Sequence, residues 1–152
     1  MKRIEKTPSI LKQVLYSQLF GILATQGKRF PHTTIVSFIS ADNLESLVFF
    51  TPKATRKMNF LREHAAVALF VDNRSNSITD LQTVAGIEAQ GNAAEVPPSA
   101  RQRYEKLYLR KYPELESFVT SPGNAMVKID VDAYNIVQHF QDVTILEMKR
   151  DL

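Results

Sequence analysis

The sequence predicts a mainly β domain with inserted helices, whose six or seven strands form an antiparallel barrel. Two observations favour this fold class. Short apolar segments of strand length, several rich in β-branched residues, follow one another through short turns. Helical patterns separate only some of them, so the chain lacks the regular β-α-β alternation that is typical of a parallel sheet. Closure into a barrel would also remove exposed edge strands.

The first half of the chain begins with a helix, because Ile10, Leu11, Val14, Leu15 and Leu19 share one helical face. Four strands and one further helix follow. The predicted strands cover Phe20–Thr25, Thr33–Ile39, Leu47–Thr51 and Ala66–Val71, and the predicted helix covers Thr55–Glu63.

The second half is predicted to contain a long strand, two helices and three strands. The polar segment Asp72–Asp80 is a loop, and the long strand Thr83–Val96 ends at Pro97-Pro98. One helix carries Ala100, Tyr104, Leu107 and Tyr108 on one side, and a shorter helix follows Pro113. The last strands are Ala125–Val131, Tyr134–Phe140 and Val143–Met148. Asp130-x-Asp132 is interpreted as the turn between the strands Ala125–Val131 and Tyr134–Phe140, in preference to a cation site.

Length and composition favour one domain over residues 1–152. The absence of cysteine excludes disulfides, thiolate metal sites and thiol nucleophiles. No apolar run approaches the roughly 20 residues of a membrane helix, and the segment Met1–Lys6 lacks the apolar core of a signal peptide. We therefore expect a cytoplasmic protein with no membrane partner. The net charge is +3, and the lysine and arginine residues do not form a basic stripe, so no nucleic-acid partner is expected.

Several common catalytic motifs are absent from the sequence. It contains neither a Gly-x-Gly-x-x-Gly fingerprint nor a Gly-x-Ser-x-Gly elbow. His32, His64 and His139 are far apart, without the spacing of metal ligands, so no metal is expected. The catalytic residues stay unknown at this level.

One segment differs from the rest. A strand ends at Thr51, and after a short loop a helix begins near Thr55-Arg56-Lys57. The N-terminus of a helix offers unpaired N–H groups and a positive dipole end, to which two hydroxyls and two cations are added here. Arginine can also hold two phosphate oxygens at once. A phosphate monoester site and a capped surface helix with solvated basic residues are both consistent with this segment taken alone.

The segment resembles the phosphate-binding motif of the pyridoxamine phosphate oxidase-like family, the FMN-binding split barrels. Phe50-Thr51 followed by Thr55-Arg56-Lys57 matches the motif with the same spacing. The similarity extends to Gly21–Thr25 with Pro31-His32, and to Gly91–Val96, which resembles a later Gly-x-Ala-x-x-Val strand. Together these pieces cover roughly Leu19 to Val96.

The resemblance implies a split barrel that forms a homodimer with FMN between the subunits. The FMN phosphate would be held at Phe50, Thr51, Thr55, Arg56 and Lys57. The flavin ring would lie against Thr34, Ile35 and Val36, largely through backbone groups. The protein would be an oxidoreductase that acts on an unknown small-molecule substrate or redox partner. The alternative is a non-catalytic flavin- or haem-binding protein, and the family also contains deazaflavin binders.

Departures from the family pattern argue against the true oxidase. Thr34 stands where the oxidases have an arginine ligand of FMN, and Ile39 stands where they have the lysine that binds the substrate phosphate. Gly86 falls near the place of a glutamine ligand of the flavin, and Gln82 is the nearest glutamine. The resemblance also implies that substrate contacts come from variable loops such as Asp72–Asp80 and from the partner subunit.

Overall fold

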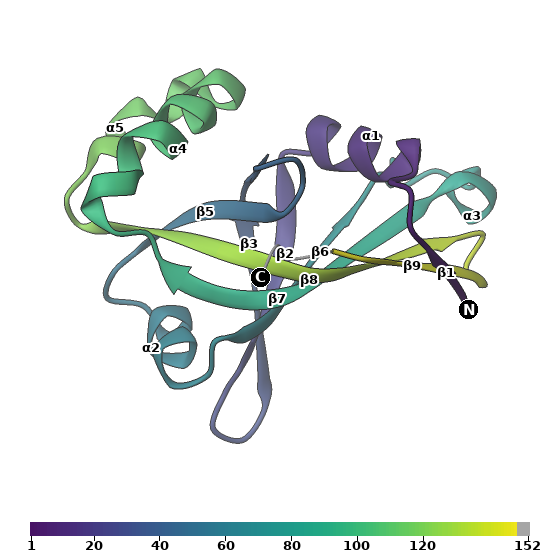
Figure 1. Cartoon of the computed structure of the whole chain (residues 1–152), viewed down its shortest axis with the longest axis horizontal. Coiled ribbons are helices and arrows are strands. Elements are labelled where there is room, and N and C mark those ends of the chain that lie inside the picture. Colours follow the sequence, from purple (N-terminus) through teal and green to yellow (C-terminus); the bar gives the residue numbers. More distant parts are fainter. Residues whose placement is uncertain (149–152) are drawn as a thin grey trace.

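One nine-stranded mixed sheet curls into a barrel with helices packed around it (Figure 1). The computed structural model describes residues 1–148. The strands are β1 (Lys2–Ile4), β2 (Phe20–Gln26), β3 (Pro31–Ser37), β4 (Ile39–Ala41), β5 (Ser46–Pro52), β6 (Ala66–Asp72), β7 (Ala85–Glu95), β8 (Asn124–Gln138) and β9 (Asp142–Glu147). The helices are α1 (Ser9–Ser17), α2 (Arg56–Glu63), α3 (Asp80–Thr83), α4 (Pro98–Lys111) and α5 (Glu116–Thr120), with a 3-10 turn at Pro113–Leu115.

Strand β8 organises the sheet, because it pairs with β7 on one edge and with two different strands on the other. Its first half pairs with β5 and its second half with β9. From β7 the sheet continues through β6 and β2 to β3, while β4 pairs with β5. Strands β3 and β5 then approach each other, although no hydrogen-bonded ladder joins them within residues 1–148. The barrel is therefore closed by packing at this seam, as a split barrel is.

The continuity of β8 corrects the expected turn at Asp130–Asp132. The chain passes through these residues as strand, with Gly91 of β7 opposite Val131 and Gln90 opposite Ala133. Asp132 is thus the extra residue of a β-bulge, which bends a strand without ending it. A Cβ on Gly91 would lie 2.1 Å from the carbonyl oxygen of Asp130, so the close approach of the two strands requires glycine.

Three further boundaries differ from the sequence predictions. The expected strand Thr33–Ile39 is broken at Phe38, because the hydroxyl of Tyr112 accepts from Phe38 N (3.1 Å) and donates to Phe38 O (2.6 Å). The long strand expected to begin at Thr83 begins at Ala85 instead, because Thr83 belongs to α3. The unexpected β1 pairs in parallel with β9, so one pair at the sheet edge departs from the antiparallel arrangement.

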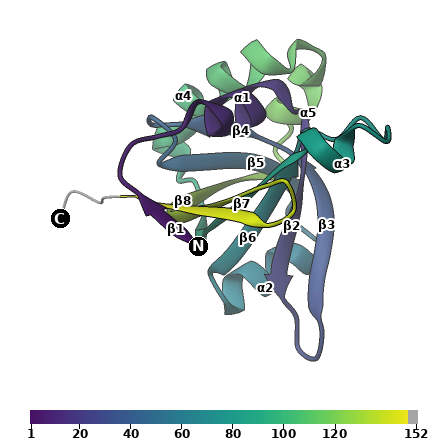
Figure 2. The same ribbon diagram turned by 90° about the vertical axis from the view of Figure 1, so that its right-hand side faces the viewer.

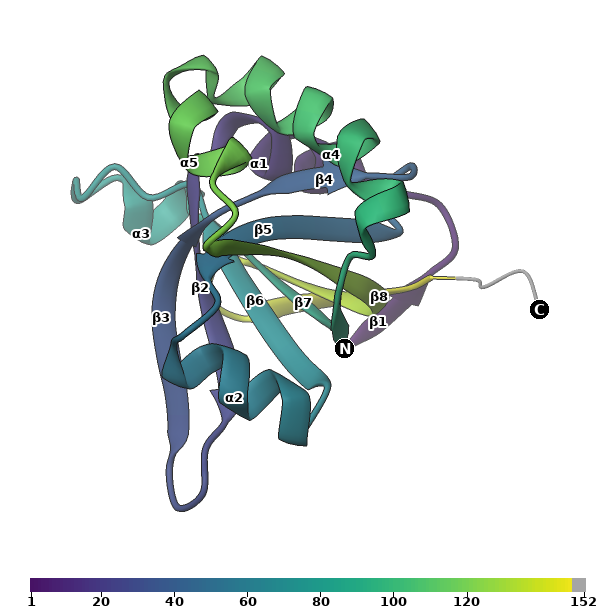
Figure 3. The same ribbon diagram turned by 90° about the vertical axis from the view of Figure 1, so that its left-hand side faces the viewer.

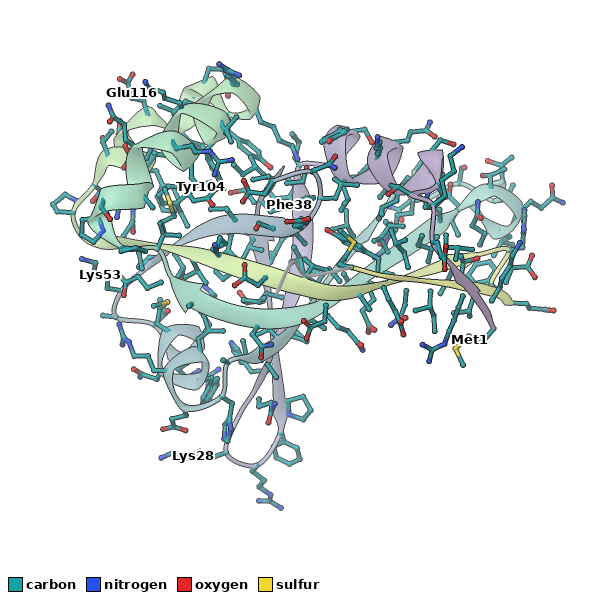
Figure 4. The ribbon with its side chains drawn as sticks, in the orientation of Figure 1. Met1, Lys28, Phe38, Lys53, Tyr104 and Glu116 are labelled. Atoms are coloured by element: carbon teal, nitrogen blue, oxygen red, sulfur yellow. The ribbon has the colours of Figure 1, made fainter. Side chains whose placement is uncertain are left out.

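Two hydrophobic cores flank β5, which explains its unbroken apolar sequence. Leu47 and Phe49 point into the barrel, while Val48 and Phe50 point to a second core beneath α4 and α5. Tyr104, labelled in Figure 4, belongs to this second core. Alternation along a strand that is covered on both sides produces apolar residues at every position.

Helices α2 and α3 lie at opposite ends of the barrel, and α1 covers it. Helix α2 lies beside the β2–β3 hairpin, and α3 lies at the opposite end of the barrel (Figures 1 and 3). Helix α1 covers the barrel with Leu11, Val14 and Leu15, which are fully buried. None of the helices within residues 1–148 is both long enough and apolar enough to cross a membrane.

Candidate functional site

The loop between β5 and α2 is held in one conformation by its own hydrogen bonds. The Thr55 hydroxyl donates to Pro52 O (3.2 Å) and accepts from Met58 N (3.3 Å), so it caps α2. Lys53, which Figure 4 labels in this loop, donates its N–H to Gly123 O (3.0 Å). The capped helix therefore begins at a defined position relative to the end of β5.

A buried hydroxyl and a half-buried ammonium meet at the start of this helix. Lys57 Nζ donates to Thr51 Oγ1 at 3.0 Å, and Thr51 is only 1% exposed. Burial lowers the pKa of Lys57 below its usual value. Within residues 1–148 the ammonium has no carboxylate partner, so its charge is desolvated without compensation. Such a group favours an anionic ligand.

Arg56 adds a second cation at the same helix end. Its side chain is exposed and has no ion pair within the described part of the chain. The first N–H groups of a helix have no intrahelical partner. Because Thr55 satisfies Met58 N, the amides of Arg56 and Lys57 remain for a ligand. The start of α2 thus offers two cations and two amides beside the Thr51 hydroxyl, while the Thr55 hydroxyl is used by the cap. This is a donor set suited to a phosphate monoester. We call these residues, Thr51, Thr55, Arg56 and Lys57, the phosphate cradle.

Strand β3 runs beside the phosphate cradle as the last strand of the sheet path (Figure 3). Thr34, Ile35 and Val36 pair with β2 on one edge, and their other edge joins no ladder within residues 1–148. Val36 points into the barrel, Thr34 is half-buried, and Ile35 is 62% exposed. Backbone groups on this edge are therefore free to meet a flat ligand.

An aromatic contact links β3 to the cradle helix. The rings of His32 on β3 and Phe60 on α2 meet edge to face, with centroids 5.5 Å apart. Because the two residues are 28 positions apart, no local pattern in the sequence predicts this contact. It holds the strand and the helix in a fixed relation.

Two of the predicted cofactor residues lie away from the cradle. The side chain of Phe50 packs in the second core, edge to face with Tyr108 at 4.8 Å, so only its backbone can contribute to a ligand site. Gln82 is on α3, at the opposite end of the barrel from α2. Near Gly86, the expected alternative, a Cβ would lie 2.8 Å from Phe70 Cζ, so the Phe70 ring takes the space of a side chain there.

Large apolar side chains are exposed in a row across three strands. Ile22 on β2 is 36% exposed and pairs with both Ile35 on β3 and Phe70 on β6, which are 62% and 39% exposed. Figure 2 shows these strands side by side on one face of the barrel. These three partly exposed side chains form what we call the apolar row.

The three histidines lie on different elements: His32 on β3, His64 directly after α2 and His139 in the turn after β8. His64 ends α2 and is exposed, whereas His139 lies in the exposed turn after β8, with Nδ1 3.3 Å from Asp142 Oδ2. Among the described residues, no three histidine, cysteine, aspartate or glutamate side chains form a group able to hold a metal.

Comparison with known proteins agrees with this architecture. The family model described as pyridoxamine 5′-phosphate oxidase matches residues 9–138. No curated protein matches the chain. Among solved structures, a pyridoxamine 5′-phosphate oxidase-like protein of Listeria innocua is 21% identical, with a TM-score of 0.65 over 84% of this chain and 95% of that one.

Two further structures carry names that mention a cofactor. A FAD-binding protein of Mesorhizobium loti is 16% identical, with a TM-score of 0.65, over 86% of this chain and 94% of that one. A heme-binding protein of Mycobacterium smegmatis is 13% identical with a TM-score of 0.77; the match covers 93% of this chain but only 59% of that one. At these identities the likeness shows a common fold.

Proposed function

Because the chain belongs to the pyridoxamine 5′-phosphate oxidase family, we propose that it is a flavoprotein that binds FMN through the phosphate cradle. The observation that carries the proposal is the Lys57 ammonium, held on buried Thr51 without a carboxylate partner within residues 1–148. A phosphate placed there would receive charge-assisted hydrogen bonds from Lys57 and Arg56, which are stronger than neutral ones. It would also accept from the helix amides.

The flavin ring is proposed to lie along the outer edge of β3. From a phosphate at the cradle, the ring would reach the unpaired edge at Thr34, Ile35 and Val36, which the His32–Phe60 contact keeps beside α2. When bound, flavin supplies the redox chemistry, so the protein's own task is to bind and orient it. The proposed position of the flavin ring depends on the backbone of β3 more than on its side chains.

We further propose a homodimer whose interface includes the apolar row. Ile22, Ile35 and Phe70 would be buried by the same three residues of a second copy, as in an isologous contact. Because Ile35 belongs both to the apolar row and to the strand proposed for the ring, this contact would place the flavin at the subunit boundary. Gln82 or the neighbourhood of Gly86 would then approach the flavin only from the partner subunit.

An oxidoreductase acting on a small molecule or redox partner is the activity that we propose for this flavoprotein. A non-catalytic flavin carrier is the alternative, and NAD(P)H oxidation in the presence of common electron acceptors separates the two. The absorption spectrum of the purified protein distinguishes flavin from haem or deazaflavin. The cytoplasmic location stays a prediction from the sequence.

The residue at the oxidase lysine position supports a function other than pyridoxamine phosphate oxidation. Ile39 is 3% exposed and packs in the second core with Tyr108. It offers neither a charge nor access to a substrate phosphate. We expect FMN-loaded protein to convert little or no pyridoxamine phosphate to pyridoxal phosphate. The rate for comparison is that of a median enzyme, about 10 turnovers per second. Turnover at that rate would contradict this expectation.

The proposed function is tested by comparing riboflavin with FMN. Loss of two charge-assisted hydrogen bonds, at about 1.5–3 kcal/mol each, weakens binding by roughly two orders of magnitude or more. Fluorescence quenching of each flavin gives the two dissociation constants. Equal constants, or no binding of either compound, would overturn the proposal.

A further inference from the structure

Three polar side chains at the C-terminal end of α4 hold the end of β3. Tyr108 and Lys111 on α4 and Tyr112 directly after it are three and four positions apart, so they share one helical face. Their contacts include Ser37, the last residue of β3, and Phe38, which follows it. We propose that these three side chains are positioning residues for the flavin ring, because they set the course of the free edge of β3. This inference rests on the proposed flavin function.

The end of β3 is fixed through its backbone and through one side chain. The hydroxyl of Tyr112 accepts from Phe38 N (3.1 Å) and lies 2.6 Å from Phe38 O. The hydroxyls of Tyr108 and Ser37 form a hydrogen bond with each other. Phe38, labelled in Figure 4, and Tyr108 are fully buried, and Tyr112 is 6% exposed. Buried hydrogen bonds of this kind keep the backbone in one arrangement, because a group that lost its partner would find no water in its place.

Lys111 is needed because one hydroxyl proton cannot serve two carbonyl groups at once. The Tyr112 hydroxyl lies 2.6 Å from Phe38 O and 2.7 Å from Leu19 O, and it carries a single proton. Lys111 Nζ donates to Phe38 O at 3.1 Å and to Leu15 O at 3.2 Å. Phe38 O thus keeps a donor while the Tyr112 proton serves Leu19 O. The last turn of α1, the residue before β2 and the residue after β3 are therefore tied to one point of the molecule, the end of α4.

The same face of α4 also contacts the strand that leads to the phosphate cradle. The ring of Tyr108 packs edge to face on Phe50, with centroids 4.8 Å apart, and Phe50 directly precedes Thr51 of the cradle. Strands β3 and β5 approach each other without a hydrogen-bonded ladder within residues 1–148, and α4 lies above β5 in Figure 3. Tyr108 bridges this seam, since its hydroxyl bonds to Ser37 on β3 while its ring contacts Phe50 on β5.

A flavin bound as proposed would span this seam. Its phosphate would lie at the cradle, beyond the end of β5, and its ring along the edge of β3 at Thr34–Val36. The spacing of the two halves of the site is therefore set by contacts across the seam rather than by a ladder. Loss of a contact at Phe38 should weaken the binding of the ring and leave the phosphate contacts in place, because those belong to α2 and Thr51.

Tyr112→Phe tests the inference, because it removes the hydroxyl and keeps the ring. The dissociation constants of this variant for FMN and for riboflavin are expected to rise together, at least fivefold each, with an unchanged ratio between them. Lys57→Met should instead weaken the binding of FMN alone, since riboflavin has no phosphate. Fluorescence quenching of each flavin gives the constants. Parent-like affinity of Tyr112→Phe for riboflavin, or a loss confined to FMN, would overturn the positioning role.

Tyr104→Phe is the matched control for the loss of a tyrosine hydroxyl. Tyr104 lies on the same helix and is 5% exposed, but its hydroxyl donates to Asp42 Oδ2 (3.1 Å) in the turn between β4 and β5, not to β3. Tyr104→Phe and Tyr112→Phe should lower the melting temperature by similar amounts, whereas Tyr104→Phe should keep both flavin affinities. Equal weakening of flavin binding in the two variants would show a general effect of stability and contradict a positioning role.

Hydrogen exchange of the flavin-free protein gives a second measurement that needs no ligand. The amide of Phe38 is expected to exchange at least tenfold faster in Tyr112→Phe and faster in Lys111→Met, but at the parent rate in Tyr104→Phe. Parent-like exchange in the first two variants would contradict the hold on β3. The two possible failures differ: a parent protein that binds neither flavin would refute the proposed function and the positioning role with it, whereas unchanged riboflavin affinity in Tyr112→Phe would refute the positioning role alone.

Discussion

Lys57 Nζ lies 3.0 Å from Thr51 Oγ1, and this contact joins the end of β5 to the first turn of α2. Thr51 is fully enclosed, whereas Lys57 keeps part of its surface open. The Lys57 ammonium is thus shielded from water where it faces Thr51, and it is accessible to a ligand where it faces solvent. The first predictions concern this pair and the helix cap beside it.

Replacement of Lys57 by methionine is expected to weaken FMN binding at least tenfold without loss of stability. Methionine keeps the length of the side chain and removes an uncompensated charge, so the free energy of unfolding should change by no more than about 0.5 kcal/mol. Urea unfolding of the flavin-free protein and flavin fluorescence measure the two quantities. Lys106→Met, at an exposed position on α4, is the control and should change neither. Lower stability with unchanged FMN affinity would make Lys57 a structural residue.

Thr55→Ala should lower both stability and FMN affinity, because Thr55 caps α2 and belongs to the phosphate cradle. Loss of an N-cap costs about 1 kcal/mol. Thr55→Ser keeps a hydroxyl in the same place, so both quantities should stay near those of the original protein. Urea unfolding and FMN titration of the two variants check this. A serine variant that behaves like the alanine variant would show that the hydroxyl is not responsible.

Ile22→Glu is expected to convert a dimer of two 17.2-kDa chains into a folded monomer. Ile22 stands in the middle of the apolar row, where a carboxylate in a subunit interface would be desolvated without a partner. Sedimentation equilibrium at micromolar concentration measures the mass. Phe30→Glu, at the tip of the β2–β3 hairpin, should remain dimeric. A monomeric parent protein would refute the proposed interface directly.

Gly91→Ala should destabilise the fold by about 1–3 kcal/mol or more, as overpacked sites do. The new Cβ would lie 2.1 Å from Asp130 O, and a backbone carbonyl in a bulge has little room to move. Gly123→Ala is a matched control, since its nearest neighbour would be Ser121 Oγ at 3.8 Å. Thermal unfolding of both variants provides the comparison, and equal melting temperatures would contradict the role assigned to Gly91.

Lys111 should make stability rise between about pH 8 and pH 10. Its Nζ donates to Leu15 O (3.2 Å) and Phe38 O (3.1 Å), and burial lowers its pKa from 10.5 to about 8. In this interval the unfolded chain binds more protons than the folded one, so the free energy of unfolding increases with pH. Lys111→Met should remove the rise, as measured by urea unfolding from pH 7 to pH 11.

Above about pH 10 stability should fall again in both proteins. Burial raises the pKa of Tyr112 to about 12 and raises that of Tyr108 as well, so the folded chain keeps protons that the unfolded chain releases. The fall serves as an internal control, because Lys111→Met leaves the tyrosines in place. An identical rise between pH 8 and pH 10 in the variant would show that Lys111 does not cause it.

The sequence predicted the mainly β fold and the positions of most strands because alternation and β-branched runs are local signals. The family resemblance, confirmed by the match over residues 9–138, rests on the spacing from Phe50-Thr51 to Thr55-Arg56-Lys57. The expected turn at Asp130–Asp132 was wrong, since exposed polar residues in a bulge have the same pattern as a turn. What distinguishes the two is Gly91 on another strand, which no local pattern near Asp130 contains.

By itself, then, the sequence determined the fold class, the absence of thiol chemistry, and the capped basic helix that follows β5. Each depends on residues close together in the chain. Only the tertiary structure decided that Lys57 has a buried hydroxyl and no carboxylate partner within residues 1–148, that Phe50 faces a second core, and that Gln82 lies far from the phosphate cradle. Desolvation and charge compensation depend on which distant segments surround a group, and that is a property of packing between strands.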